Sequence, residues 1–104
     1  MGDNLLIEKS KSGDIRLNLP ATLDLAAAEA LQGACLEAVA ADADLHLDGA
    51  EVAKVSTACL QILVATDRKL SQQGGALLLT SPSEPLSEAM LDLGMNGYLD
   101  KWSR

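Results

Sequence analysis

The spacing of the apolar residues changes along the chain, and this change constrains the fold more than any other feature. Residues 15–19 alternate apolar and polar side chains, which is typical of a strand with one buried face. From residue 24 to residue 40, apolar side chains recur every three or four positions, which predicts an amphipathic helix with Asp24 as its N-cap. A chain that switches between these two periods favours helices packed on a sheet.

Three more strands are predicted from short apolar runs. Residues 5–7 are near enough to residues 15–19 to pair with them as a hairpin, and residues 45–47 form a second short run. Residues 76–80 are continuously apolar, which predicts a strand that is covered on both faces.

Two more helices follow from the same patterns. One is expected to start near Ser56 or Thr57 and to run to Gln73, where Gly74-Gly75 stops it. The other is expected over residues 86–93, and the tail at 98–102 is expected to be a short strand or a helical turn.

The order of these elements predicts an α/β fold. Helices that alternate with strands imply parallel crossover connections, whereas the first hairpin is antiparallel. We therefore expect residues 1–104 to form one domain with a mixed, mostly parallel sheet of about four strands, an antiparallel N-terminal strand and three or four flanking helices.

Composition and charge exclude several classes of function. The chain has one Tyr, one Trp and no Phe, so the core must be built from aliphatic residues. With 15 acidic and 8 basic residues, the net charge of −7 argues against nucleic-acid partners and anionic membrane surfaces, and favours a partner with a basic patch. No apolar run is long enough to span a bilayer and no signal peptide is evident, so we expect a cytoplasmic protein without direct membrane insertion.

No catalytic or metal-binding pattern is found. The lone His46 lies mid-strand between leucines, without a second His or a suitable nucleophile, and is expected to be a structural or surface residue. Cys35 and Cys59 do not form a CxxC pair and cannot complete a zinc site with one His. We therefore predict a protein that is not an enzyme and holds no metal or cofactor.

The start of the second predicted helix is the most informative segment. At about 100° per residue, Cys59, Ile62, Leu63, Thr66 and Leu70 fall on one side, and Thr57, Gln61, Val64 and Arg68 fall on the other. If the first set faces the sheet, the Thr57 hydroxyl is accessible. It is then a candidate phosphorylation site, because a helix N-terminus offers free amide donors and the positive end of the dipole. Ser56 is the less favoured phosphorylation candidate, and its alternative role is to cap the helix.

Several segments resemble the STAS domain family, typified by bacterial anti-sigma factor antagonists, over nearly the whole chain. The resemblance rests on Leu47-Asp48-Gly49, on residues 55–63 (Val-Ser-Thr-Ala-Cys-Leu-Gln-Ile-Leu), on residues 74–79 and on the helix at 83–94. Family members usually have Asp before the phosphorylated hydroxyl, which maps onto Thr57, and here Ser56 occupies that position. Lys54 adds a nearby positive charge, and Cys59 stands where Gly is common.

The resemblance implies a bacterial signalling module that regulates an anti-sigma factor or serine kinase, and hence transcription. Docking is expected through the N-terminal part of the second helix, with partner contacts at Lys54, Ser56, Thr57, Leu60, Gln61, Val64 and Arg68. A narrower likeness of residues 19–28 and 59–63 to small chemotaxis-associated STAS proteins implies an alternative, an adaptor that binds a chemotaxis histidine kinase without being phosphorylated. A further alternative is an accessory subunit of an ABC lipid transporter.

Overall fold

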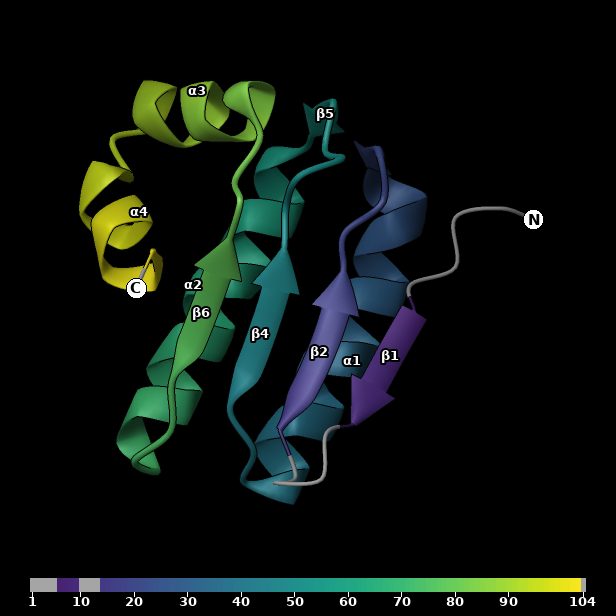
Figure 1. The fold of residues 1–104 in the computed structure, drawn as a ribbon, viewed down its shortest axis with the longest axis vertical. Coiled ribbons are helices and arrows are strands. Elements are labelled where there is room, and N and C mark those ends of the chain that lie inside the picture. The colour runs from purple at the N-terminus through teal and green to yellow at the C-terminus, as the bar shows by residue number, and fades with distance from the viewer. Residues whose placement is uncertain (1–5, 10–13, 104) are drawn as a thin grey trace.

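The computed structural model describes residues 6–9 and 14–103, and four of the strands form one sheet. In the order in which they pair, these strands are β1 (Leu6–Lys9), β2 (Ile15–Asn18), β4 (Leu45–Asp48) and β6 (Leu77–Thr80). β1 is antiparallel to β2, whereas β2, β4 and β6 are parallel to one another (Figure 1). The predicted fold class is therefore confirmed. Leu5 and residues 10–13, which connect the two strands of the predicted hairpin, lie outside the described residues.

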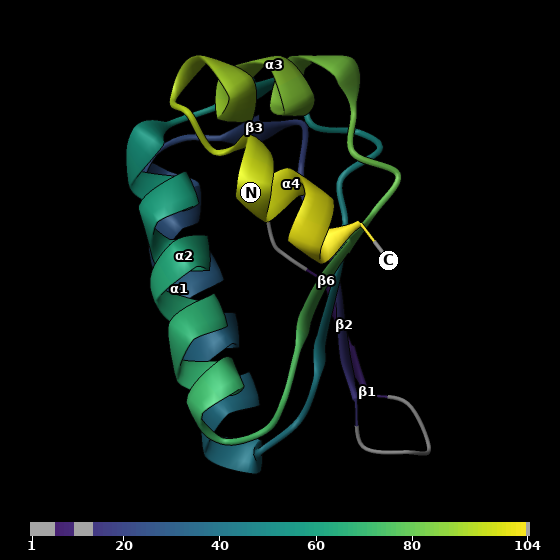
Figure 2. The same ribbon diagram turned by 90° about the vertical axis from the view of Figure 1, so that its left-hand side faces the viewer.

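Helices α1 (Leu25–Ala41) and α2 (Thr57–Gln72) lie side by side on one face of the sheet (Figure 2). The core fills the space between these helices and the sheet, and Ile15, Leu45 and Leu77 are buried neighbours across the three parallel strands. Asp24 caps α1 as predicted, because its carboxylate accepts a hydrogen bond of 3.0 Å from the Ala27 N–H.

The other face of the sheet is not covered by any helix of the described residues (Figure 2). Arg16, His46 and Leu78 are neighbours in register on this face; Arg16 is exposed and the other two are half-buried. The expectation that residues 76–80 form a strand covered on both faces is therefore wrong. α1 and α2 occupy only one side, and α4 packs along the β6 edge instead of over the face (Figure 1).

The C-terminal part folds into two short helices, α3 (Glu84–Asp92) and α4 (Asn96–Trp102). α3 starts two residues before the predicted position, because the Ser83 hydroxyl accepts a hydrogen bond of 3.2 Å from the Leu86 N–H and so caps the helix. The tail is helical, and Trp102, which the sequence did not single out, is 0% exposed. Its ring centroid lies 5.4 Å from that of Tyr98.

Two strands of two residues each were not predicted. β3 (Thr22–Leu23) and β5 (Lys54–Val55) pair in parallel beside the main sheet. Strands this short carry no periodic signal in the sequence. Their pairing matters because each directly precedes the start of a long helix.

Gly49 allows α3 to pack closely over the end of β4. A Cβ atom at this position would lie 2.8 Å from Leu86 Cδ2 and 3.3 Å from Leu79 Cδ1. The Gly49 carbonyl also accepts a hydrogen bond from the Ser83 N–H at 3.0 Å. Within residues 6–9 and 14–103, no helix has the length and hydrophobicity of a membrane span.

Candidate functional site

The start of α2 is capped by Ser56. This residue has an extended backbone, and its hydroxyl accepts a hydrogen bond of 3.3 Å from the Cys59 N–H. Ser56 therefore has the capping role that the sequence left open. Its hydroxyl, the less favoured phosphorylation candidate, is already used in the cap.

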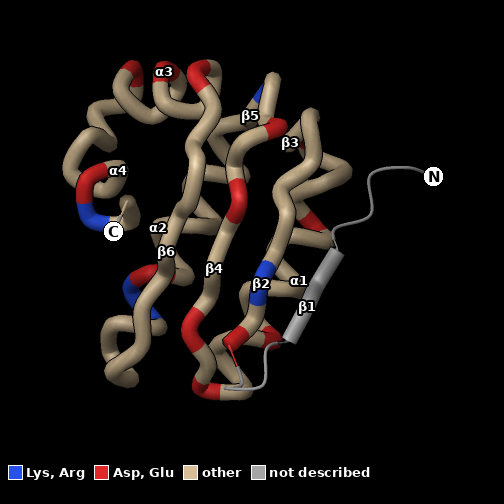
Figure 3. The backbone as a smooth tube through the Cα atoms, viewed as in Figure 1, with Lys and Arg blue, Asp and Glu red and all other residues tan. Residues whose placement is uncertain are grey.

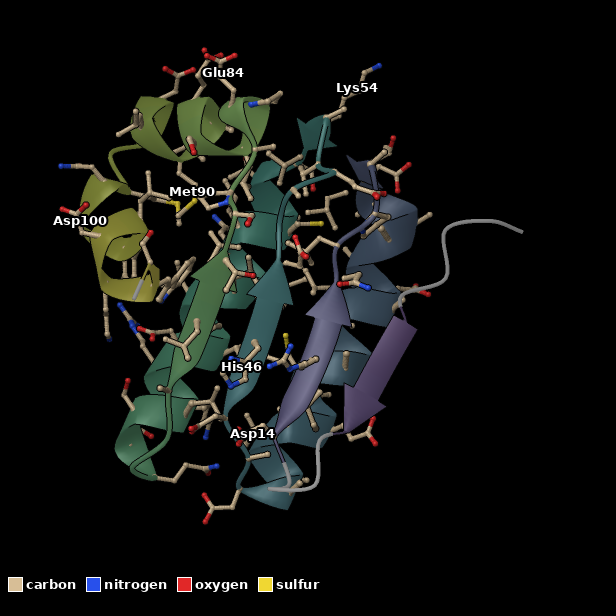
Figure 4. The ribbon with its side chains drawn as sticks, in the orientation of Figure 1. Asp14, His46, Lys54, Glu84, Met90 and Asp100 are labelled. Carbon is tan, nitrogen blue, oxygen red and sulfur yellow. The ribbon has the colours of Figure 1, made fainter. Side chains whose placement is uncertain are left out.

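Thr57 is the first residue of α2 and is exposed. The backbone N–H groups of a first helical turn have no intrahelical partners and form the positive end of the helix dipole. Lys54, the first residue of β5, is also exposed, and its side chain projects away from the body of the protein (Figure 4). A hydroxyl, a cation and a helix N-terminus therefore lie within four consecutive positions.

The β3–β5 pair holds this helix start in place. The Ser56 N–H donates to the Leu23 carbonyl at 2.8 Å, and the buried Cys59 thiol donates to the carbonyls of Leu23 and Asp24 at 3.5 and 3.6 Å. Since Asp24 is the N-cap of α1, the starts of both helices are joined by backbone and thiol hydrogen bonds. The helix wheel placed Cys59 on the side expected to face the sheet, but its hydrogen bonds depend on β3, which was not predicted.

Replacing Ser56 with alanine is expected to lower the free energy of unfolding by about 1 kcal/mol, because the Cys59 N–H loses its acceptor. Urea unfolding followed by circular dichroism measures this change. Ser56→Asp is the control, since Asp is an equally good N-cap and should retain wild-type stability. An unchanged stability of the alanine variant would contradict the capping role.

The outward side of α2 carries a stripe formed by Thr57, Gln61, Val64 and Arg68, which we call the α2 stripe. Thr57, Gln61 and Arg68 are exposed, whereas Val64 is half-buried and packs against the core. Three of the four residues therefore face outward as the wheel predicted, and Val64 lies at the border with the core.

Two positions of α2 differ from the predicted arrangement. Leu60, one of the expected partner contacts, is only 1% exposed and belongs to the core, so its side chain is not available to a partner. Ile62, expected to face the sheet, is half-buried and lines a surface groove. The wheel assumed that the sheet is the only cover of α2, whereas α1 also packs along this helix and Ile62 lines the groove between the two.

Asp67 is buried although it is charged. Its Oδ2 accepts a hydrogen bond of 2.8 Å from Lys101 Nζ of α4, while its Oδ1 and Trp102 Nε1 have no hydrogen-bond partner among the described residues. The sequence did not identify this contact. The available signal was the position of Asp67, which follows Leu60 by seven residues and Leu63 by four and therefore lies on the same helix face.

An apolar groove runs between α1 and α2, and we call it the α1–α2 groove. Its lining includes Leu25, Ala28, Leu36, Ala58, Ile62 and Ala65. Leu25 and Leu36 are the two most exposed large apolar side chains among the described residues, at 76% and 61%. Gln61 belongs both to the groove and to the α2 stripe, so the two surfaces are continuous.

Cys35 lies on the floor of the α1–α2 groove and is buried. Burial raises the pKa of its thiol above the ordinary value, and a hydrogen bond with the Thr66 side chain partly opposes that shift. A thiol with a raised pKa is protonated at neutral pH and is a poor nucleophile. The environment of Cys35 therefore favours a packing role over a reactive one.

The uncovered face of the sheet carries a small polar hollow, lined by Arg16, His46, Asp48 and Thr80. His46 Nε2 lies 3.5 Å from Asp14 Oδ2, and Figure 4 shows the two side chains near the start of the parallel strands. His46 is half-buried, with no nucleophile assembled beside it in the part of the chain that the structure describes. Within the same residues, no group of three His, Cys, Asp or Glu side chains has the arrangement of a metal site.

Comparisons with known proteins agree with this architecture. A family model described as "Mlab, STAS domain" matches residues 7–100. The structure of the Bacillus cell fate determinant SpoIIAA in its phosphorylated form is similar to this one, with a TM-score of 0.76 and 16% sequence identity. The match covers 96% of this chain and 88% of SpoIIAA. The structure of SpoIIAA in its unphosphorylated form has a TM-score of 0.77 and 14% sequence identity, and the match covers 96% of this chain and 85% of that one. No curated protein sequence matches the chain.

A third similar structure is an anti-sigma-factor antagonist (STAS) domain protein from Planctomyces limnophilus. Its TM-score is 0.75 and its sequence identity is 18%, and the match covers 100% of this chain and 90% of the other. At such identities the structural likeness shows the fold, whereas the family model shows the relationship in sequence.

Proposed function

Because the chain belongs to the STAS domain family, we propose that it is a non-enzymatic signalling module that regulates a partner protein in the bacterial cytoplasm. The partner in this proposal is an anti-sigma factor or serine kinase, which docks on Lys54, the backbone around Ser56 and the α2 stripe. The observation that carries the proposal is the position of Thr57, exposed at the first residue of a helix whose start is held rigidly.

The character of the α2 stripe supports docking. It presents a hydroxyl, an amide, a partly covered valine and a guanidinium, which can form directional hydrogen bonds around a small apolar contact. Arg is also enriched at protein interfaces relative to Lys and Glu. Leu60 is excluded from the docking surface because it is buried.

The location of Thr57 supports regulation by phosphorylation. A phosphoryl group would add about two negative charges beside the free N–H groups of the first helical turn, so the domain would remain folded. The same charges would lie on the surface that the partner contacts and would weaken docking. SpoIIAA, which shares the fold, has been solved in both phosphorylated and unphosphorylated forms.

The docking surface is tested by capture of partners from the source cell. The wild-type protein is immobilised beside the charge reversal Arg68→Glu, and bound proteins are identified by mass spectrometry. The matched control is Arg16→Glu, which makes the same change at an exposed position on the uncovered face of the sheet. We expect a kinase or anti-sigma factor to be captured by the wild type and the control but lost with Arg68→Glu. Equal loss with both variants would contradict docking through α2.

A second candidate function is an adaptor that binds a chemotaxis histidine kinase without being phosphorylated. The observation that favours it is Ser56, a neutral residue whose hydroxyl is used for capping, where the family usually has Asp. Capture of a histidine kinase, together with wild-type binding by Thr57→Glu, would support this candidate over the first. Capture of a transporter ATPase would instead indicate an accessory subunit of an ABC system.

A further inference from the structure

We propose that the α1–α2 groove binds an amphipathic helix of the partner protein, with basic residues of that helix lying along α1. This inference rests on the proposed function and names a second part of the docking surface, continuous with the α2 stripe through Gln61. Three features of the molecule carry it: the exposed leucines of α1, the small side chains that line the groove, and the charge of α1.

The apolar contacts of the groove have the spacing of a helical ligand. Leu25 and Leu36 are eleven residues apart on α1, which corresponds to about 16 Å and three helical turns. Between the two helices, Ala28, Ala58 and Ala65 leave room for larger side chains to enter. A ligand helix with apolar residues every three or four positions could place them over these alanines and between the two leucines.

The charge of α1 specifies which kind of helix fits. No Lys or Arg occurs between Arg16 and Lys54, a segment that contains α1 (Figure 3). Four acidic residues lie on α1 or at its two caps, namely Asp24, Glu29, Glu37 and Asp42. Glu29 is exposed on the groove itself, whereas the basic residue of the groove, Lys69, comes from α2. The α1 side therefore attracts cationic side chains of a ligand.

The same charge argues against two other occupants. A second copy of this chain would bring a second acidic α1 against the first, and like charges across an interface oppose association. An anionic lipid or vesicle surface would meet the same carboxylates. A basic amphipathic helix of a partner is the occupant for which apolar and electrostatic contacts agree.

The test uses the full chain and two synthetic 18-residue helical peptides as probes. Both peptides carry the same leucine stripe, flanked by Lys and Arg in one peptide and by Glu in the other. Fluorescence anisotropy of labelled peptides gives the dissociation constants, and chemical shifts of the protein amides locate the site. We expect the basic peptide to bind in the groove at least about tenfold more tightly than the acidic one. Equal affinity, or shifts outside the groove, would overturn the inference.

Variants of the protein separate the groove from general surface effects. Leu36→Asp is expected to weaken the basic peptide by about tenfold or more, because it places a charge on the apolar wall. The control is Leu91→Asp, since Leu91 is similarly exposed, at 53%, but belongs to α3 and does not line the groove. Both variants change exposed positions, so both should remain folded. An equal effect of the two would contradict the inference.

Further outcomes separate this inference from the proposed function. If the basic peptide fails to bind while partner capture still depends on Arg68, the groove inference fails and docking through the α2 stripe stands. If the peptide binds but capture does not depend on Arg68, the proposed function fails instead. Sedimentation that shows a Leu36-dependent dimer, or binding of phosphatidylglycerol vesicles abolished by Leu36→Asp, would replace the helix by another occupant and overturn the inference.

Discussion

Thr57→Glu is expected to weaken binding of the captured partner by about 30-fold or more. A loss of this size corresponds to about 2 kcal/mol, which is typical of a contact that matters at a protein interface. The physical reason is that the new carboxylate lies on the exposed first turn of α2, in the centre of the proposed docking surface. The domain itself should remain stable, because an acidic side chain at a helix N-terminus interacts favourably with the dipole. Isothermal titration calorimetry measures the affinity, and thermal unfolding verifies the fold.

Thr57→Ala provides the comparison for this prediction. It removes the hydroxyl without adding charge, so we expect a much smaller loss of affinity and no response to a cognate kinase. Arg16→Glu, which adds negative charge on the uncovered face of the sheet, should bind like the wild type. Undiminished binding by both Thr57 variants would remove the switch from the proposed function.

Trp102→Ala is expected to lower the free energy of unfolding by about 3–5 kcal/mol, a large part of the stability of a domain of this size. Trp102 is fully buried and is the largest side chain in a core that otherwise consists of aliphatic and sulfur-containing residues. Its removal would leave a cavity beneath α4 and would loosen the contact of α4 with β6. Urea unfolding followed by far-ultraviolet circular dichroism measures the change.

Two variants control for the cause of that loss. Trp102→Phe preserves most of the buried apolar volume and removes an indole N–H that has no hydrogen-bond partner among the described residues, so it should be much less destabilising than Trp102→Ala. Leu93→Ala, at an exposed position just after α3, should have little effect. A stability of Trp102→Ala equal to that of the wild type would show that α4 does not contribute to the core.

Local patterns were sufficient to predict the long helices and most of the sheet. α1 and α2 were predicted because each has a capping side chain, Asp24 or Ser56, followed by several turns of periodic apolar residues. These signals act over three or four residues and do not depend on the rest of the fold. The exposed position of Thr57 was predicted in the same way, from the angular position of the residues of α2.

Features that depend on what packs over an element were not predictable by this route. Leu60 was expected to contact a partner and is buried, and Asp67, which the sequence did not single out, is also buried. Asp67 is reached by Lys101 of α4, a residue 34 positions further along the chain. A helix wheel divides a helix into an inner and an outer side, but it cannot show that a third side is covered by a distant segment.

The sequence alone determined the four strands of the main sheet, the two long helices, their order and the start of α2 near Ser56 or Thr57, since capping, periodicity and turn chemistry are local. Only the tertiary structure decided that α1 and α2 share one face of the sheet with a groove between them, and that β3 and β5 join their starts. It also decided that α4 closes the β6 edge. The reason is that these features arise from contacts between residues tens of positions apart, such as the hydrogen bond from Cys59 to Leu23, for which no local pattern exists.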